Sequence, residues 1–283
     1  MIEKYIRTDK IFHHPDRLLA YKNNKTILPI TVEIHLTNEC NINCYYCSFK
    51  DKHNKLEMTT KEAKYCIGNL QRSGVKAITF SGGGEPTTHK DYAELCGYAY
   101  YCGLDVSLIT NGIKFNPEVL QYLTWIRFSV DACDKDTYKI IKGVDKFETV
   151  IENILKAVRH KNNCGFNCTI GFQSVINDFN INRLDVMAEC AEFLCVDYYQ
   201  YRPVEGETLD KPILNKDYNI KIIDSWYKWE EIQNAKSYTN CPGADFIGAV
   251  GADYNYYICC HHVGDKTASY GNILTDDIIA NAR

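Results

Sequence analysis

The chain of 283 residues contains no apolar run that approaches the ~20 residues needed to cross a bilayer. Its first five residues, Met-Ile-Glu-Lys-Tyr, also lack the apolar stretch of a signal peptide. No basic run exceeds a few residues and the formal net charge is −4, so nothing electrostatic points to nucleic acid or an anionic membrane as a partner. We therefore expect a cytoplasmic protein that binds neither.

Low-complexity segments and short internal repeats are absent as well. The remaining composition is that of a globular protein, because a hydrophobic content of 45% supports a substantial core. The length suits one large α/β domain, or one and a half to two domains.

Cysteine, by contrast, is abundant, with fourteen residues. In a secreted chain this number would suggest disulfides. Without a signal peptide, metal sites and reduced core thiols are the better expectation. Several cysteines lie on apolar faces of expected helices and are predicted core residues: Cys66, Cys96, Cys102, Cys190 and Cys195.

Strand-like runs alternate with helical patterns over the first 200 residues. Strands are expected at 30–36, 75–80, 104–109, 125–130, 168–175 and 196–201. Helices are expected near 58–72, 90–102, 117–123, 136–141, 147–159 and 182–194. This alternation is typical of parallel βαβ units, and six repeats favour an open, partial barrel over a closed eight-stranded one.

The composition changes after Pro203. A polar linker at 205–217 precedes an expected helix at 218–232, in which Trp226 and Trp229 would share one face. A short segment rich in glycine and cysteine follows. We expect three parts: an N-terminal extension at 1–27, an α/β barrel at 28–204 and a smaller module at 205–283.

Cys40, Cys44 and Cys47 follow the first expected strand with the spacing Cys-x3-Cys-x2-Cys. Three thiolates suit three irons of a [4Fe–4S] cube, and the fourth iron is then open to a substrate or cofactor. The alternatives are a zinc knuckle or three unrelated core cysteines. Structural zinc usually needs two Cys pairs, or a Cys pair and a His pair, and the only downstream His pair is the adjacent His261-His262.

Polar residues follow the later strands, and ligands of parallel α/β sheets bind at the carboxyl ends of the strands. Gly82-Gly83-Gly84-Glu85 follows the second expected strand. Glycines allow a close approach of backbone to a ligand, and Glu85 offers an acceptor for an ammonium group. The alternative interpretation is an ordinary glycine-rich turn.

The cysteine spacing, with the aromatic Tyr46 just before the third cysteine, resembles the signature of the radical S-adenosylmethionine (radical SAM) superfamily. The resemblance implies a partial (β/α)6 barrel and a [4Fe–4S] cluster whose open iron chelates the methionine part of SAM. It also implies that an electron from the cluster cleaves SAM to a 5′-deoxyadenosyl radical, which abstracts hydrogen from a substrate.

Further residues match this family's patterns. Gly83, Gly84 and Glu85 resemble its Gly-Gly-Glu motif, which holds the SAM amino group. Ser129 and Asp131 resemble a pattern that contacts the SAM carboxylate and ribose, although Asp131 could instead cap a helix. Other polar residues near the strand ends are expected to bind the cofactor as well: Tyr46, Asn111, Gln173 and Arg202. Cys133 follows Asp131 and is expected to serve as a hydrogen-atom donor.

The tail resembles the first half of a SPASM/Twitch extension, because Cys241-x17-Cys259 is followed by Gly271-Asn-Ile. The resemblance implies a second iron–sulfur cluster, bound by Cys241, Cys259 and Cys260. The tail departs from the SPASM/Twitch pattern, because Cys260 is the last cysteine of the sequence. A histidine or a distant thiol could complete the site, an iron could stay open, or the tail could bind no metal.

We therefore expect a radical SAM enzyme that oxidises or epimerises a small polar substrate of the sugar or cyclitol type. Only about 30 residues precede the first expected strand, which is short for a separate peptide-binding domain. A peptide-modifying enzyme is the alternative, and a non-catalytic iron–sulfur or zinc protein is the alternative of another class. A flavodoxin- or ferredoxin-type protein is the expected electron donor.

Overall fold

The computed structural model describes residues 10–25, 27, 29–207, 209–226 and 241–276. These residues form two compact units. Unit 1 comprises the described parts of 1–40, 52–108 and 240–283, and unit 2 those of 41–51 and 109–239. The expected boundaries after residues 27 and 204 stay a prediction. No helix of the described residues is long and apolar enough to cross a membrane.

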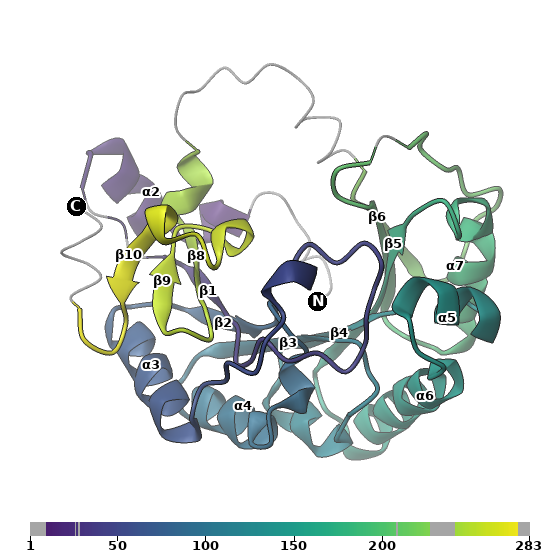
Figure 1. The fold of residues 1–283 in the computed structure, drawn as a ribbon, viewed down its shortest axis with the longest axis horizontal. Coiled ribbons are helices and arrows are strands. Elements are labelled where there is room, and N and C mark those ends of the chain that lie inside the picture. The colour runs from purple at the N-terminus through teal and green to yellow at the C-terminus, as the bar shows by residue number, and fades with distance from the viewer. Residues whose placement is uncertain (1–9, 26, 28, 208, 227–240, 277–283) are drawn as a thin grey trace. The chain divides into compact units, whose positions relative to one another are not determined.

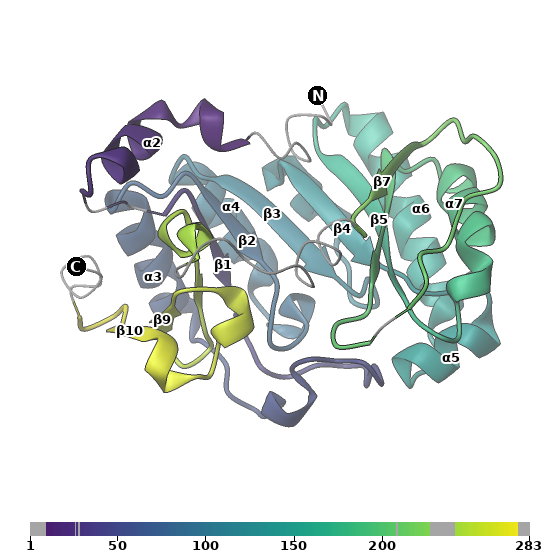
Figure 2. The ribbon, with the colours of Figure 1, turned by 90° about the horizontal axis from the view of Figure 1, so that it is seen from above.

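The sheet of unit 1 is built on three parallel strands: β1 (Thr31–Ile34), β2 (Ala77–Phe80) and β3 (Asp105–Thr110), of which residues 105–108 belong to this unit. Alternate residues of β1 and β2 are buried, and α3 (Thr60–Arg72) and α4 (Tyr92–Tyr101) cover one face of these strands (Figures 1 and 2). Buried aliphatic and aromatic side chains therefore fill the layer between strands and helices. The unit also contains α2 (Pro15–Lys22) and the 3-10 helices η1 (Lys10–His13) and η3 (Pro86–Thr88).

The tail adds strands to the other edge of β1. β8 (Ile247–Val250) runs parallel to β1, and β9 (Asn255–Tyr257) and β10 (Ser269–Asn272) continue the sheet in antiparallel fashion. Short 3-10 helices precede and connect these strands: η6 (Pro242–Asp245), η7 (Cys260–His262) and η8 (Lys266–Ala268). The sequence had not predicted these strands.

The sheet of unit 2 has four neighbouring parallel strands: β4 (Trp125–Ser129), β5 (Thr169–Ile176), β6 (Tyr198–Pro203) and β7 (Lys221–Asp224). Three helices cover one face of it (Figure 1): α5 (Lys135–Lys142), α6 (Phe147–Cys164) and α7 (Leu184–Phe193). The remaining 3-10 helices of the described residues are η2 (Lys50–Lys52), η4 (Pro117–Tyr122) and η5 (Ile181–Arg183).

The six expected strands are confirmed. Five of the six helices expected before residue 200 are confirmed as α3 to α7, whereas the segment expected near 117–123 is the 3-10 helix η4. The helix expected at 218–232 is wrong in its first part, because Lys221–Asp224 forms β7 beside β6. Trp226 is buried just after this strand, whereas Trp229 lies outside the described residues. The alternation of βα units is that of the expected mixed α/β class.

The expectation of core cysteines is partly correct. Cys66 and Cys96 are buried, and Cys102 and Cys190 are partly exposed. Cys195 is exposed after the end of α7, with φ at 56°, so its assignment to the core is wrong.

Candidate functional site

The three cysteines of the Cys-x3-Cys-x2-Cys motif lie in the irregular segment after β1, and we call residues 40–47 the cysteine loop. All three thiols are reduced and partly buried. The backbone N–H of Cys47 donates to the carbonyl of Cys44 at 3.2 Å, which makes the turn between them tight. Burial raises the pKa of the Cys44 thiol, while the ammonium of Lys142 acts in the opposite direction. Reduced thiols on a short loop are a donor set that fits iron.

In unit 1, the Gly82–Glu85 turn after β2 is bonded to the chain just before Cys40. The N–H of Gly84 donates to the carbonyl of Thr37, and the N–H of Glu85 donates to that of Glu39, both at 2.9 Å. A Cβ on Gly84 would lie 2.2 Å from the Glu39 carbonyl oxygen. Only glycine therefore permits this approach. We call Thr37–Glu39 together with Gly82–Glu85 the glycine shelf.

Glu85 is buried at the end of this shelf. Its Oε1 accepts hydrogen bonds from the N–H of Thr87 at 3.0 Å and from the Thr87 hydroxyl at 2.6 Å. The carboxylate thereby caps η3 and is held in one orientation. Its expected role as the acceptor for the SAM ammonium stays a prediction.

We expect Glu85→Gln to weaken SAM binding by about ten- to a hundredfold, because a charge-assisted hydrogen bond is worth about 1.5–3 kcal/mol. The amide keeps an oxygen that can cap η3, so the melting temperature should change little. Equilibrium dialysis with labelled SAM measures the affinity. A variant that binds SAM as tightly as the parent would contradict the assignment.

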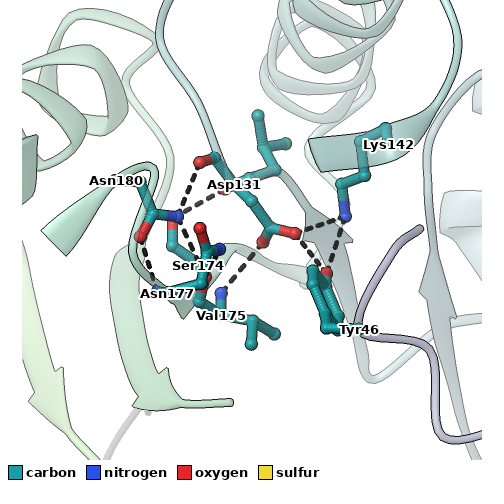
Figure 3. Close-up of polar contacts among 8 residues, drawn as sticks. Tyr46, Asp131, Lys142, Ser174, Val175, Asn177 and Asn180 are labelled. Atoms are coloured by element: carbon teal, nitrogen blue, oxygen red, sulfur yellow. Dashed lines mark hydrogen bonds and ion pairs between the residues drawn. The ribbon is translucent and has the colours of Figure 1, made fainter. Parts of the chain in front are cut away.

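In unit 2, a buried charge pair lies beside the cysteine loop (Figure 3). The ammonium of Lys142 is 2.7 Å from Oδ2 of Asp131, and both side chains are almost fully buried. The hydroxyl of Tyr46 donates to the same Oδ2 and accepts from Lys142 at 3.2 Å. We call these three residues the Tyr46–Asp131–Lys142 clasp.

The clasp is charged. Burial alone would lower the pKa of Lys142, but the neighbouring Asp131 and Tyr46 outweigh it and hold that pKa well above its usual value. Burial and then Asp131 raise the pKa of Tyr46, so the phenol keeps its proton. The second oxygen of Asp131 accepts the N–H of Val175 at 2.9 Å. Both oxygens of this carboxylate are thus held by the protein.

The C-terminal end of α5 also binds the cysteine loop through its backbone. The N–H groups of Asn43 and Tyr45 donate to the carbonyls of Lys142 at 3.0 Å and Ile141 at 3.2 Å. The last carbonyls of a helix have no partner within the helix, so the loop satisfies them. Gly143 follows with φ at 70°, and a Cβ there would come within 2.8 Å of the Asn43 carbonyl oxygen.

Two asparagines tie the ends of β4 and β5 to this arrangement (Figure 3). Nδ2 of Asn180 donates to the carbonyls of Asp131 at 2.8 Å and Val175 at 2.9 Å. The N–H of Asn177 donates to Oδ1 of Asn180 at 2.8 Å. These bonds keep Asp131 in place beneath the loop.

We expect Lys142→Met to destabilise the protein by about 3–5 kcal/mol, because it leaves Asp131 charged and buried without its partner. Adding Asp131→Asn should recover part of the lost free energy of unfolding, since this exchange removes the uncompensated charge. Urea denaturation of the metal-free protein measures both changes. Lys139→Met, on the exposed side of the same helix, is the matched control and should be nearly neutral. Equal midpoints for the two Lys variants would show that the pair contributes nothing.

The structure places the other expected SAM contacts of unit 2 as follows. Asn111 donates from Nδ2 to Oδ1 of Asn41 at 2.7 Å, so it contacts the cysteine loop. Ser129 is in register with Gln173 across β4 and β5. Arg202 lies at the end of β6, 3.4 Å from the carboxylate of Glu205. Their roles toward SAM stay predictions, as does that of Asp131, which the clasp already engages.

Cys133 lies against another thiol. Its pKa is raised first by a hydrogen bond with Cys190 of α7 and then by burial. The expected role of Cys133 as a hydrogen-atom donor stays a prediction.

The tail brings together a second group of donors in unit 1. The ligand atoms of Cys259, Cys260 and His261 all lie within 4.8 Å of one another. A hydrogen bond from Cys260 lowers the pKa of Cys259 to about 5, although burial opposes it, so this thiol ionises readily. Thiolates are the metal-binding form. Cys241 is exposed at the start of η6 and is not in this group, whereas His261 joins it.

The sequence of residues 34–180, just over half of the chain, matches the family model of the radical SAM superfamily. The chain belongs to the radical SAM superfamily. Members of this family use a [4Fe–4S] cluster and SAM. The donor set of the cysteine loop agrees with this.

Three curated relatives illustrate the range of the family. The chain is 40% identical over 128 residues to an S-adenosylmethionine-dependent nucleotide dehydratase of Selenomonas ruminantium. The aligned segment covers 42% of this chain and 46% of the relative. The chain is 30% identical over 169 residues to the mycofactocin maturase MftC of Mycolicibacterium smegmatis, covering 58% and 42%. It is 34% identical over 137 residues to a probable GTP 3′,8-cyclase of Pyrococcus abyssi, covering 46% and 44%. The chain thus matches less than half the length of each relative.

Solved structures share the fold. SuiB of Streptococcus suis, bound to its precursor peptide SuiA, superposes with a TM-score of 0.71 at 15% identity, over 93% of this chain and 66% of that one. The protein anSMEcpe with bound AdoMet gives 0.65 at 15% identity, over 90% and 80%. The fold is therefore the expected partial (β/α)6 barrel with a small additional C-terminal module.

Proposed function

We propose that this radical SAM protein is an enzyme that holds a [4Fe–4S] cluster on Cys40, Cys44 and Cys47 and binds SAM at the remaining iron. When bound, the cluster supplies the electron that cleaves SAM to a 5′-deoxyadenosyl radical, which abstracts hydrogen from the substrate. The observation that supports this proposal most is the loop itself, which carries three reduced thiols and is fixed by the clasp and the end of α5.

The chain's own residues would then orient the cofactor. The glycine shelf presents backbone close to the amino group of SAM, and Glu85 accepts hydrogen bonds from the N–H bonds of that group. Asn111, Ser129, Gln173 and Arg202 supply polar groups near the strand ends for the rest of the molecule. Tyr46 lies beside Cys47, where the clasp holds its ring in place. Such preorganisation saves the cost of ordering these groups when SAM binds.

We expect replacement of Cys40, Cys44 and Cys47 together by Ala to abolish release of 5′-deoxyadenosine, because no iron can then bind in the loop. The assay uses anaerobically reconstituted protein with dithionite and SAM. Cys66→Ala removes a buried thiol outside the loop and is the control, which should retain SAM cleavage. Undiminished release from the triple variant would contradict the proposal.

For the substrate we favour a small polar molecule of the sugar or cyclitol type, which the enzyme would oxidise or epimerise. Two of the relatives carry names that specify nucleotide chemistry, a nucleotide dehydratase and a GTP 3′,8-cyclase, and nucleotides contain a sugar. A peptide is the second candidate, because MftC is named as a maturase and matches the longest of these segments. A flavodoxin- or ferredoxin-type protein would deliver the electron.

We also propose that the tail binds a second iron–sulfur cluster, as in a SPASM/Twitch extension. Cys259 and Cys260 would be its ligands, with Cys241 from the start of η6. His261 would add a nitrogen donor to this set, and the closeness of its ligand atom to those of Cys259 and Cys260, within 4.8 Å, supports this proposal. A cluster there could accept an electron from a substrate radical, or bind substrate at an open iron.

The iron content of the Cys40/Cys44/Cys47 triple-Ala protein tests this second cluster. About four irons per chain should remain after reconstitution, because a cubane contains four. A further Cys259→Ala exchange should remove them. Essentially no iron in the triple variant would refute the tail cluster and leave the module as a purely structural part of the sheet.

A further inference from the structure

His35 is a buried polar residue that none of the expected motifs contains. It follows β1 directly and its side chain has no exposed surface. Its ring bonds in two directions within unit 1. The N–H of Gly83 donates to Nδ1 at 3.0 Å, and Nε2 lies 2.8 Å from Oε1 of Glu33.

These two contacts together fix the tautomer of the imidazole. Nδ1 accepts a hydrogen bond, so the ring proton is on Nε2, from where it is donated to Glu33. Glu33 and His35 are two residues apart along the strand direction, so their side chains lie on the same face of the sheet. The carboxylate therefore keeps the lone pair of Nδ1 directed at the glycine shelf.

The ring also lies directly against the backbone of the shelf. A Cβ on Gly82, which has φ at 108°, would come within 1.8 Å of the His35 ring. On the next residue, a Cβ on Gly83 would be 2.7 Å from Oδ1 of Asn38. The first two glycines are thus needed because side chains of the preceding segment occupy the space beside them.

One edge of β1 pairs with β2, and its other edge pairs with β8 of the tail. The N–H of His35 donates to the carbonyl of Val250 at 2.9 Å, which continues the pairing of β1 with β8. Glu33 also lies near the Cys260 thiol, whose pKa it raises, after the larger effects of Cys259 and burial. His35 thus bonds to the glycine shelf through its ring and to β8 of the tail through its backbone.

We propose that His35 is the positioning residue of the SAM amino-group site, and that Glu33 sets its tautomer. The Nδ1 acceptor holds the peptide unit before Gly83, and with it the turn that leads to Gly84 and Glu85. The role toward SAM rests on the proposed function, whereas the contact with Gly83 does not. Without this acceptor the buried N–H of Gly83 loses its bond and the turn is no longer held in one conformation.

Two substitutions test the two ring nitrogens of His35 separately. His35→Asn places an amide oxygen near the position of Nδ1 and keeps an acceptor for Gly83. His35→Gln places its amide near the position of Nε2 and keeps a partner for Glu33 only. A third substitution, His89→Gln, is the matched control, because His89 is also buried in unit 1 and its ring bonds to the carbonyl of Met58 at 2.9 Å.

The first measurement is SAM affinity by equilibrium dialysis on reconstituted protein, with iron content as a check. His35→Gln should bind SAM roughly ten- to a hundredfold more weakly, since leaving a buried N–H unsatisfied has an effect of this order. His35→Asn and His89→Gln should stay within about threefold of the parent, and all variants should keep the same iron content. Parent-like affinity of His35→Gln, or equal losses in all three variants, would overturn the proposal.

The second measurement is amide hydrogen exchange of the peptide that contains Gly83, in metal-free protein. Exchange should be slow in the parent and in His35→Asn and at least about tenfold faster in His35→Gln, because the Nδ1 bond protects this amide. Unchanged exchange in His35→Gln would refute the contact itself. If the parent protein does not bind SAM but exchange follows this pattern, the proposed function fails while the positioning of the turn by His35 stands.

Discussion

The buried charge pair between Lys142 and Asp131 is the interaction on which the geometry of the cysteine loop depends. Taking two charges out of water is costly, and the pair is tolerated only where further hydrogen bonds complete it. Here Tyr46 and the N–H of Val175 supply them. Because Tyr46 lies between Cys44 and Cys47, bonds that satisfy a buried carboxylate also fix the loop that carries the thiols. The carbonyls at the end of α5 also hold the loop, because they accept hydrogen bonds from its backbone.

The glycine shelf of unit 1 relies on close packing and backbone bonds, where the clasp relies on charge. Its glycines allow the turn after β2 to approach the residues before Cys40, and two backbone bonds join them. The tail contributes through β8, which pairs with β1 and so supports the strand that leads into both the shelf and the loop. The glycine shelf in unit 1 and the clasp in unit 2 are thus each held by elements distant in sequence.

Local patterns in the sequence predicted much of the fold and of the candidate site. The Cys-x3-Cys-x2-Cys motif, the Gly-Gly-Glu turn and the six strands are short-range signals, and the structure confirms the strands. Lys142 and His35 were missed because their roles arise from tertiary contacts, and because a lysine is rarely buried. β7 was taken for part of a helix because the two tryptophans three residues apart suggested helical spacing, whereas Lys-Ile-Ile-Asp pairs with β6. β8 lies beside β1 across more than 200 residues of chain, which no local pattern indicates.

The proposed chemistry depends on three cysteines that hold a cluster whose remaining iron binds the amino group of SAM. The most direct measurement is pulsed electron paramagnetic resonance of the dithionite-reduced protein with SAM labelled with ¹⁵N in its amino group. SAM should shift the signal of the cluster, and a coupling to ¹⁵N should appear. An unchanged signal without ¹⁵N coupling, at concentrations where dialysis shows that SAM is bound, would contradict the proposed chemistry.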